Sequence, residues 1–185
     1  AGVKFNGAIR NGAGAKSADG GSSGGAADNG LAWDFALTTD GETIGMPGFS
    51  VGAGYGEAET GTEKDSTPGG DDEHMTAFAN YSYGPATIGA GISNIDKGGT
   101  TAVDQEATRW GVAVNVNDSL SVSYGESTVT YRNASAANVD EDTTGMAVAY
   151  TMGSMKIAGN RNESNNIGGA GGSDAMTEIA LSFAF

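Results

Sequence analysis

Large apolar residues occupy every second position in ten segments of the chain. The clearest segment covers residues 109–117, where Trp and Val at even positions alternate with Arg, Gly, Ala and Asn at odd positions. Successive side chains of a strand point to opposite faces of its sheet, so this period predicts β-strands with one apolar face. The predicted strands cover approximately residues 2–12, 30–38, 49–59, 73–83, 87–95, 106–116, 119–131, 143–152, 155–163 and 177–185.

The second face of these strands consists mostly of Gly, Ala, Ser, Thr and Asn. Alternation by itself fits a soluble β-sandwich, with the large residues packed inside, as well as a transmembrane barrel, with the large residues in lipid. A dry protein interior needs bulky side chains to reach its normal packing density, whereas a water-filled lumen does not. The small residues therefore favour a barrel whose lumen they line.

The connections between the predicted strands alternate in length. Long segments rich in Gly, Asp, Asn and Ser occur at 13–29, 60–72, 96–105, 132–142 and 164–176, whereas tight turns occur at 83–86, 117–119 and 152–154. The connection 39–48 is an exception, because it is longer than a tight turn. Outer-membrane barrels have short periplasmic turns and long external loops. The even number of strands places both ends of the set on the same side.

Aromatic residues lie near the ends of the predicted strands, as in the interfacial girdles of a transmembrane barrel. They are Phe49, Tyr81, Tyr83, Trp110, Tyr124, Tyr150, Phe183 and Phe185. The pattern thus predicts an all-β, antiparallel transmembrane β-barrel, with residues 1–185 forming one barrel segment.

Composition excludes several other classes of protein. The chain of 185 residues contains 9 Lys and Arg against 23 Asp and Glu, so binding to nucleic acid has almost no electrostatic support. No apolar run approaches the roughly 18 residues of a transmembrane helix. A secreted β-solenoid adhesin would show a fixed repeat period, and the chain has none. The single histidine, His74, has no recognisable catalytic partners, so we expect no enzyme, no catalytic residue and no cofactor.

Three stretches of the sequence resemble known outer-membrane proteins. Residues 178–185 are similar to the C-terminal strand of outer-membrane barrels, which ends in an aromatic residue. Residues 145–153 with 155–159, and residues 75–84 with 87–91, resemble hairpins of general diffusion porins from alphaproteobacteria. The resemblance implies a Gram-negative outer-membrane porin that assembles as a homotrimer in lipid and lipopolysaccharide.

The same resemblance implies that the ten segments are the last ten strands of a 16-stranded barrel. Six N-terminal strands of the same protein and its inward-folded constriction loop would then lie outside this chain. A complete ten-stranded barrel is the alternative interpretation. The function implied is a water-filled channel for passive diffusion of small hydrophilic solutes and ions. The alternative function is a closed outer-membrane barrel or surface adhesin that acts through its external loops.

The alternation also predicts which charged residues line the pore. The inward set comprises Lys4, Arg10, Asp34, Arg109, Lys156 and Glu178. We expect the four basic residues to form part of a positive wall that faces acidic groups elsewhere. The alternative is that they are solvated near the barrel ends or form local ion pairs.

Most of the acidic excess falls in the predicted external loops, at Asp65, Asp71, Asp72, Glu73, Asp104, Glu106, Asp140, Glu141 and Asp142. Hard cations such as Ca²⁺ prefer carboxylate oxygens, so surface-bound Ca²⁺ is one interpretation. Solvation of the loops is the simpler interpretation, because the chain has no calcium-loop spacing.

Overall fold

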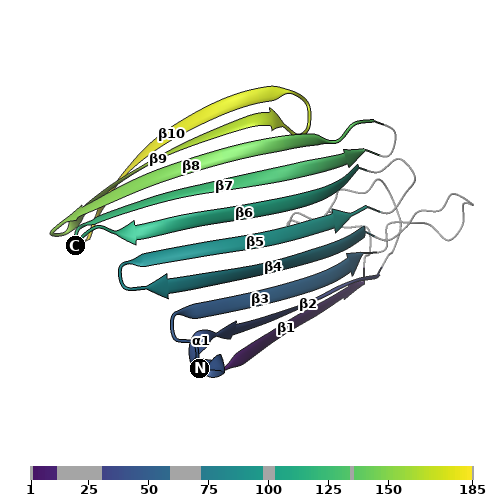
Figure 1. Ribbon diagram of the computed structural model, residues 1–185, viewed down its shortest axis with the longest axis horizontal. Coiled ribbons are helices and arrows are strands. Elements are labelled where there is room, and N and C mark those ends of the chain that lie inside the picture. Colours follow the sequence, from purple (N-terminus) through teal and green to yellow (C-terminus); the bar gives the residue numbers. More distant parts are fainter. Residues whose placement is uncertain (1, 12–30, 59–71, 98–102, 134–135, 185) are drawn as a thin grey trace, which may run out of the picture.

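The computed structural model describes residues 2–11, 31–58, 72–97, 103–133 and 136–184. They form one sheet of ten strands, which Figure 1 shows as a single curved layer. The strands are β1 (Val3–Asn11), β2 (Leu31–Asp40), β3 (Phe49–Ala58), β4 (Asp72–Tyr83), β5 (Ala86–Asp96), β6 (Val103–Asn115), β7 (Leu120–Asn133), β8 (Val139–Met152), β9 (Met155–Ile167) and β10 (Gly172–Phe183). The all-β, antiparallel architecture predicted from the sequence is confirmed.

The sheet is a simple meander. Each strand pairs antiparallel with its neighbours in the chain, and the order across the sheet is the order in the sequence. β1 and β10 form the two edges and do not pair with each other. Figure 1 shows the start of β1 and the end of β10 at the edge that carries the short turns, as the even strand number predicts.

The connection between β2 and β3 contains a single helical turn, α1 (Gly41–Ile44). Asp40 caps its start, because the Thr43 amide and hydroxyl both donate to Asp40 Oδ1, at 3.1 and 2.9 Å. Gly45 ends the turn in the left-handed region, at φ 72°. The capped turn explains why this connection is longer than the other turns at the same edge.

Several strands extend further toward the loops than predicted. β6 begins at Val103, β8 begins at Val139, and β9 continues to Ile167. The prediction of a long loop at 164–176 is wrong, because β10 begins at Gly172 and only residues 168–171 form the turn. Beyond the bilayer both faces of a sheet meet water, so apolar alternation ends while backbone pairing continues.

The acidic residues predicted in external loops need the same correction. Asp72, Glu73, Asp104, Glu106, Asp140, Glu141 and Asp142 lie in strands, whereas Asp65 and Asp71 lie outside the described residues. These carboxylates therefore occupy the paired ends of strands near the loops.

The described part of the chain has no hydrophobic core. None of its hydrophobic residues is buried, and large apolar side chains such as Val148 and Leu181 are 47% and 55% exposed. A soluble sandwich would bury these side chains against a second layer. The apolar face is therefore a surface that needs lipid. No helix within the described ranges is long and apolar enough to cross a bilayer.

On the apolar face, the boundary between apolar and polar residues runs obliquely across the strands. From β3 to β10, four pairs of directly opposed residues join a large apolar residue of one strand to a polar residue of the next: Met75–Asn94, Ile92–Thr108, Trp110–Glu126 and Met146–Arg161. At each such pair the boundary moves two residues toward the turns.

These shifts give the tilt of the strands. Four shifts of two residues, across the seven spacings from β3 to β10, correspond to a slope of about 40° at roughly 3.4 Å per residue and 4.8 Å per strand. Strands of transmembrane barrels tilt by about 35–45°. The apolar–polar boundary thus follows the membrane surface, and it crosses the strands obliquely because the strands are tilted.

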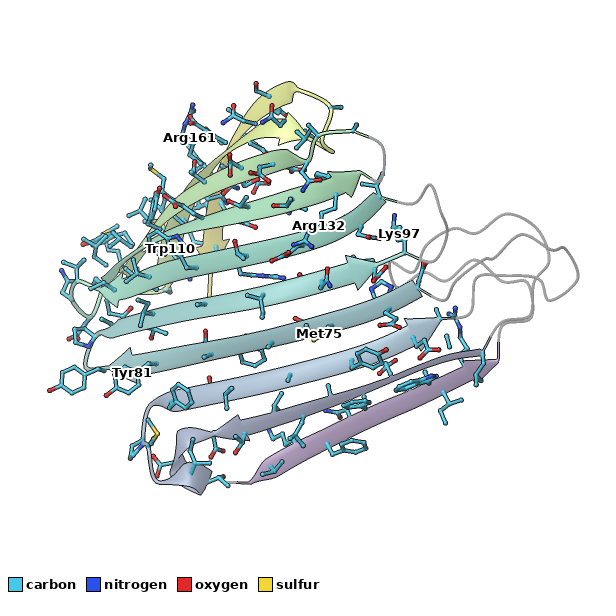
Figure 2. The ribbon with its side chains drawn as sticks, turned by 45° about the vertical axis from the view of Figure 1, so that its right-hand side comes forward. Met75, Tyr81, Lys97, Trp110, Arg132 and Arg161 are labelled. Atoms are coloured by element: carbon cyan, nitrogen blue, oxygen red, sulfur yellow. The ribbon has the colours of Figure 1, made fainter. Side chains whose placement is uncertain are left out.

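Aromatic side chains mark this boundary on β6 and β7. Trp110 Nε1 donates to Glu126 Oε2 at 3.2 Å, and the Tyr124 hydroxyl donates to Glu126 Oε1 at 2.6 Å. Each ring lies on the apolar side and each polar atom reaches the first charged residue above it, as expected at a lipid–water interface. Figure 2 shows Tyr81 near the turn edge, with Lys97 and Arg132 toward the loop edge.

Substitutions of adjacent residues on β8 should separate the two faces. Val148→Arg places a charge in the middle of the apolar band, and we expect a loss of about 2–4 kcal/mol in the free energy of unfolding. Ala147→Arg, on the small-residue face, should cost much less because its guanidinium reaches water. Denaturant unfolding from phospholipid vesicles measures both variants, and equal losses would contradict the assignment of the faces.

Candidate functional site

The small-residue face of the sheet is hollowed. A depression of about 700 Å³ extends from β4 to β9, and its lining includes Thr76, Phe78, Asn80, Gly91, Arg109, Ser123, Ala147, Asn160 and Asn162. Most of the lining residues belong to the small-residue face of six consecutive strands, which indicates that the sheet curves toward that face. The small residues therefore line the concave side, and the apolar residues cover the convex side.

Glycines form the floor of this hollow. Gly89, Gly111, Gly125 and Gly145 oppose one another directly across β5, β6, β7 and β8. Because glycine has no side chain, the surface of the concave wall along this row is formed by backbone atoms. At one end of the row the Asn80 amide occupies the space that a Cβ on Gly89 would fill.

Among the described residues that line this hollow, Arg109 is the only charged one. Its Cγ and Cδ atoms lie over Gly91, about where a Cβ on that glycine would make van der Waals contact, 3.5 and 3.6 Å away. The guanidinium Nη2 donates to Ser93 Oγ at 3.0 Å. The arginine thus lies along the wall over Gly91, bonded to Ser93, and its side chain is exposed.

Glu178 lines a second, adjoining hollow of about 450 Å³, and it is the only charged residue among the described residues that line it. Asn160 Nδ2 donates to Glu178 Oε2 at 3.1 Å, and Asn162 Nδ2 donates to Asn160 Oδ1 at 3.4 Å. The two hollows share Ala113, Ser123, Ala147 and Asn160. A continuous, uncharged trough therefore joins a cationic side chain on β6 to an anionic side chain on β10.

The other residues predicted to line the pore lie on the same face. Strand register places Lys4, Arg10 and Asp34 opposite Thr38, Ala32 and Ala8, and Lys156 opposite Thr151 and Ser182. All six predicted side chains are exposed, and none forms an ion pair with another member of the set. The structure thus brings them to one wall but not into one cluster.

The asparagines and Phe78 of the trough were not among the predicted site residues. Alternation assigns Asn80, Asn160 and Asn162 to the small-residue face, but only the register places them beside the charged residues. Phe78 breaks the alternation, because it lies on the concave face over Gly52, where a Cβ would come within 2.5 Å of the ring. A large residue on the small-residue face, opposite a glycine, is the signal that could have identified it.

The described residues contain no group of three or more His, Asp or Glu side chains that could hold a metal ion. The only ion pairs between side chains in the described ranges, Arg132–Glu106 and Arg161–Glu163, lie on the convex face near the loops. The concave wall offers hydrogen-bonding groups and separated charges.

Comparisons with solved structures show the same fold. A porin refined at 1.8 Å resolution superposes with a TM-score of 0.64 at 17% identity, over 85% of this chain and 52% of that one. OmpT, an outer membrane protein of Vibrio cholerae, superposes with a TM-score of 0.55 at 16% identity in its trimer form, over 85% of this chain and 62% of that one. A second structure of the in-vitro folded OmpT gives 0.55 at 15% identity, over 98% and 76%. The chain thus spans about half the length of the first of these proteins.

The family comparison covers nearly the whole chain. The family model for Gram-negative porins matches residues 1–151 and, in a second alignment, residues 47–184. No curated protein matches the sequence. The chain belongs to the Gram-negative porin family, whose members lie in the outer membrane.

Proposed function

We propose that this chain forms part of the wall of a water-filled channel for passive diffusion of small hydrophilic solutes and ions. The observation that carries the proposal is the concave trough of small and uncharged residues beneath Arg109 and Glu178. Bulky side chains would fill the space inside a barrel, whereas Gly, Ala and Ser leave it to water. Transport through such a wall needs no catalytic step.

The two sheet edges support a larger closed barrel. β1 and β10 each leave one row of backbone groups without a partner strand in the sheet. Each unpaired group costs several kcal/mol in the hydrocarbon region, so further strands must cover both edges. We propose that six more strands of the same protein close a 16-stranded barrel, and that three such barrels form a homotrimer in lipid and lipopolysaccharide. OmpT of Vibrio cholerae has been described as a trimer.

Charge separation along the trough suggests how solutes are selected. Arg109 and Glu178 lie four strands apart, which is about 19 Å measured across the strands. Opposite charges on a concave wall produce a field across the lumen, which orients dipolar solutes and biases the passage of ions. Lys4, Arg10, Asp34 and Lys156 extend this charged lining beyond the trough. A closed barrel that acts through its loops has less support, because it would need side chains that fill this space.

The size of the lumen can be tested by adding bulk to the trough. We expect Ala147→Trp to lower the single-channel conductance in planar lipid bilayers, because the indole enters the space above the glycine row. Val148→Trp is the matched control, since its side chain enters the lipid. Equal conductance in both variants and the unmodified protein would contradict a channel lined by this face.

Neutralising the charged residues should change ion selectivity in opposite directions. Arg109→Gln, alone or with Arg10→Gln, should shift the reversal potential toward cation selectivity, and Glu178→Gln should shift it toward anion selectivity. Arg132→Gln removes the same charge from the convex face and serves as control. The measurement is the reversal potential in a salt gradient, and an unchanged value in the Arg109 and Glu178 variants would remove their proposed role.

A further inference from the structure

The turn between β9 and β10 is held against the concave wall near the loops. Pairing between β8 and β9 begins at Asp142–Asn165, and the register between β9 and β10 shifts between Gly172 and Ser173. The shift leaves Asn166 as an extra residue, and it adopts a left-handed conformation with φ 55°. Such a bulge bends its strand, so the tip of this hairpin leaves the plane of the sheet.

One carboxylate on β8 receives hydrogen bonds from three directions. The Gly168 amide donates to Glu141 Oε2 at 2.9 Å, and the Tyr131 hydroxyl donates to the same atom at 2.9 Å. Ser164 Oγ donates to Glu141 Oε1 at 3.2 Å. The donors come from the turn, from β7 and from β9, so Glu141 connects the tip to two strands of the wall.

Two further contacts hold the same tip. Asn166 Nδ2 donates to the Asp140 carbonyl oxygen at 2.8 Å. Gly169, with φ 72°, lies against the ring of Tyr131, and a Cβ at this position would be 3.1 Å from Tyr131 Cγ. Only glycine allows both this backbone conformation and this approach.

Strand register places these contacts on the concave face. Glu141 lies opposite Val129, Val129 lies opposite Ala107, and Ala107 lies two residues from Arg109 on the same side of β6. The outward neighbours of Glu141 on β8 are Asp140 and Asp142, which lie above the apolar band. The tip therefore folds over the wall at the external end of the trough, outside the hydrocarbon region.

We propose that Glu141 is a positioning residue that holds the β9–β10 tip against the wall and so keeps the external mouth of the channel open. This inference rests on the proposed channel function. When the three hydrogen bonds are lost, the tip becomes free to move into the mouth, and the channel closes transiently.

Acid should release the tip. The Gly168 amide, with Tyr131 and Ser164, holds the pKa of the Glu141 carboxyl below its ordinary value. The contribution of these bonds is thus fully present at neutral pH and is lost as the pH falls through that lowered pKa, in the acid range. Among the described residues, the titratable groups that face Glu141 are the Tyr131 phenol on β7 and, across Ser164, the Asp174 carboxyl on β10. Neither supplies a positive charge that would hold the tip in acid.

Two substitutions test the proposal by different routes. Glu141→Gln removes the charge, with Asp142→Asn as control for the same change on the convex face. Gly169→Ala adds a methyl group against Tyr131 without changing any charge. Its control is Gly171→Ala, which has a similar φ of 77° but nothing within 4 Å of the added Cβ.

The readouts are single-channel recordings at neutral pH and at about pH 3, and hydrogen exchange of residues 166–172 in the folded protein. We expect Glu141→Gln and Gly169→Ala to show at neutral pH the brief closures that the unmodified channel shows only in acid. We expect exchange in this segment to rise about tenfold, because hydrogen bonds to a charged group are lost or strained. The two control variants should match the unmodified protein.

The proposed channel function and the proposed role of Glu141 would fail with different experimental results. If the unmodified protein forms no channel, the proposed function fails, and exchange alone still tests whether Glu141 holds the tip. If it conducts but Glu141→Gln and Gly169→Ala gate as the controls do at both pH values, the role of Glu141 in the mouth is overturned. Unchanged exchange in both variants would overturn the role of Glu141 in holding the tip.

Discussion

The structure depends on the need to pair every backbone amide and carbonyl where the chain meets hydrocarbon. An antiparallel meander meets this need strand by strand and leaves side chains free to face two different environments. This explains why ten strands can form one layer without a hydrophobic core, and why residues such as Val148 and Leu181 remain exposed. Stability comes from lipid on the convex face and from the ladder within the sheet.

The tilt of the strands links the membrane to the trough. A tilt of about 40° makes the apolar boundary cross the strands obliquely, so residues at one depth in the membrane do not lie opposite one another in the ladder. On the concave side the glycine row follows the ladder and not the membrane plane. As a result Arg109 and Glu178 face the same trough from strands that lie far apart in the chain.

Polar groups become denser toward the loops. Near the turns the convex face is apolar. Beyond the Trp110–Glu126–Tyr124 cluster, the strands gain pairs such as Thr128–Asp142 and Thr130–Asp140. Side chains stabilise the ladder there because both faces meet water. The contacts of Glu141 with the β9–β10 tip belong to this external region, where a polar network costs little desolvation.

The sequence by itself determined the strands, their two faces and the side on which each predicted pore residue lies, because a period of two assigns a face without knowledge of any partner. It did not determine where strands end beyond the bilayer, because alternation disappears there while pairing continues, as β9 and β10 show. Only the tertiary structure decided which residues meet. The register of the strands brings Asn160 into contact with Glu178, Ser93 with Arg109, and the β9–β10 turn with Glu141. Such contacts depend on how strands pair, and no local sequence pattern encodes that pairing.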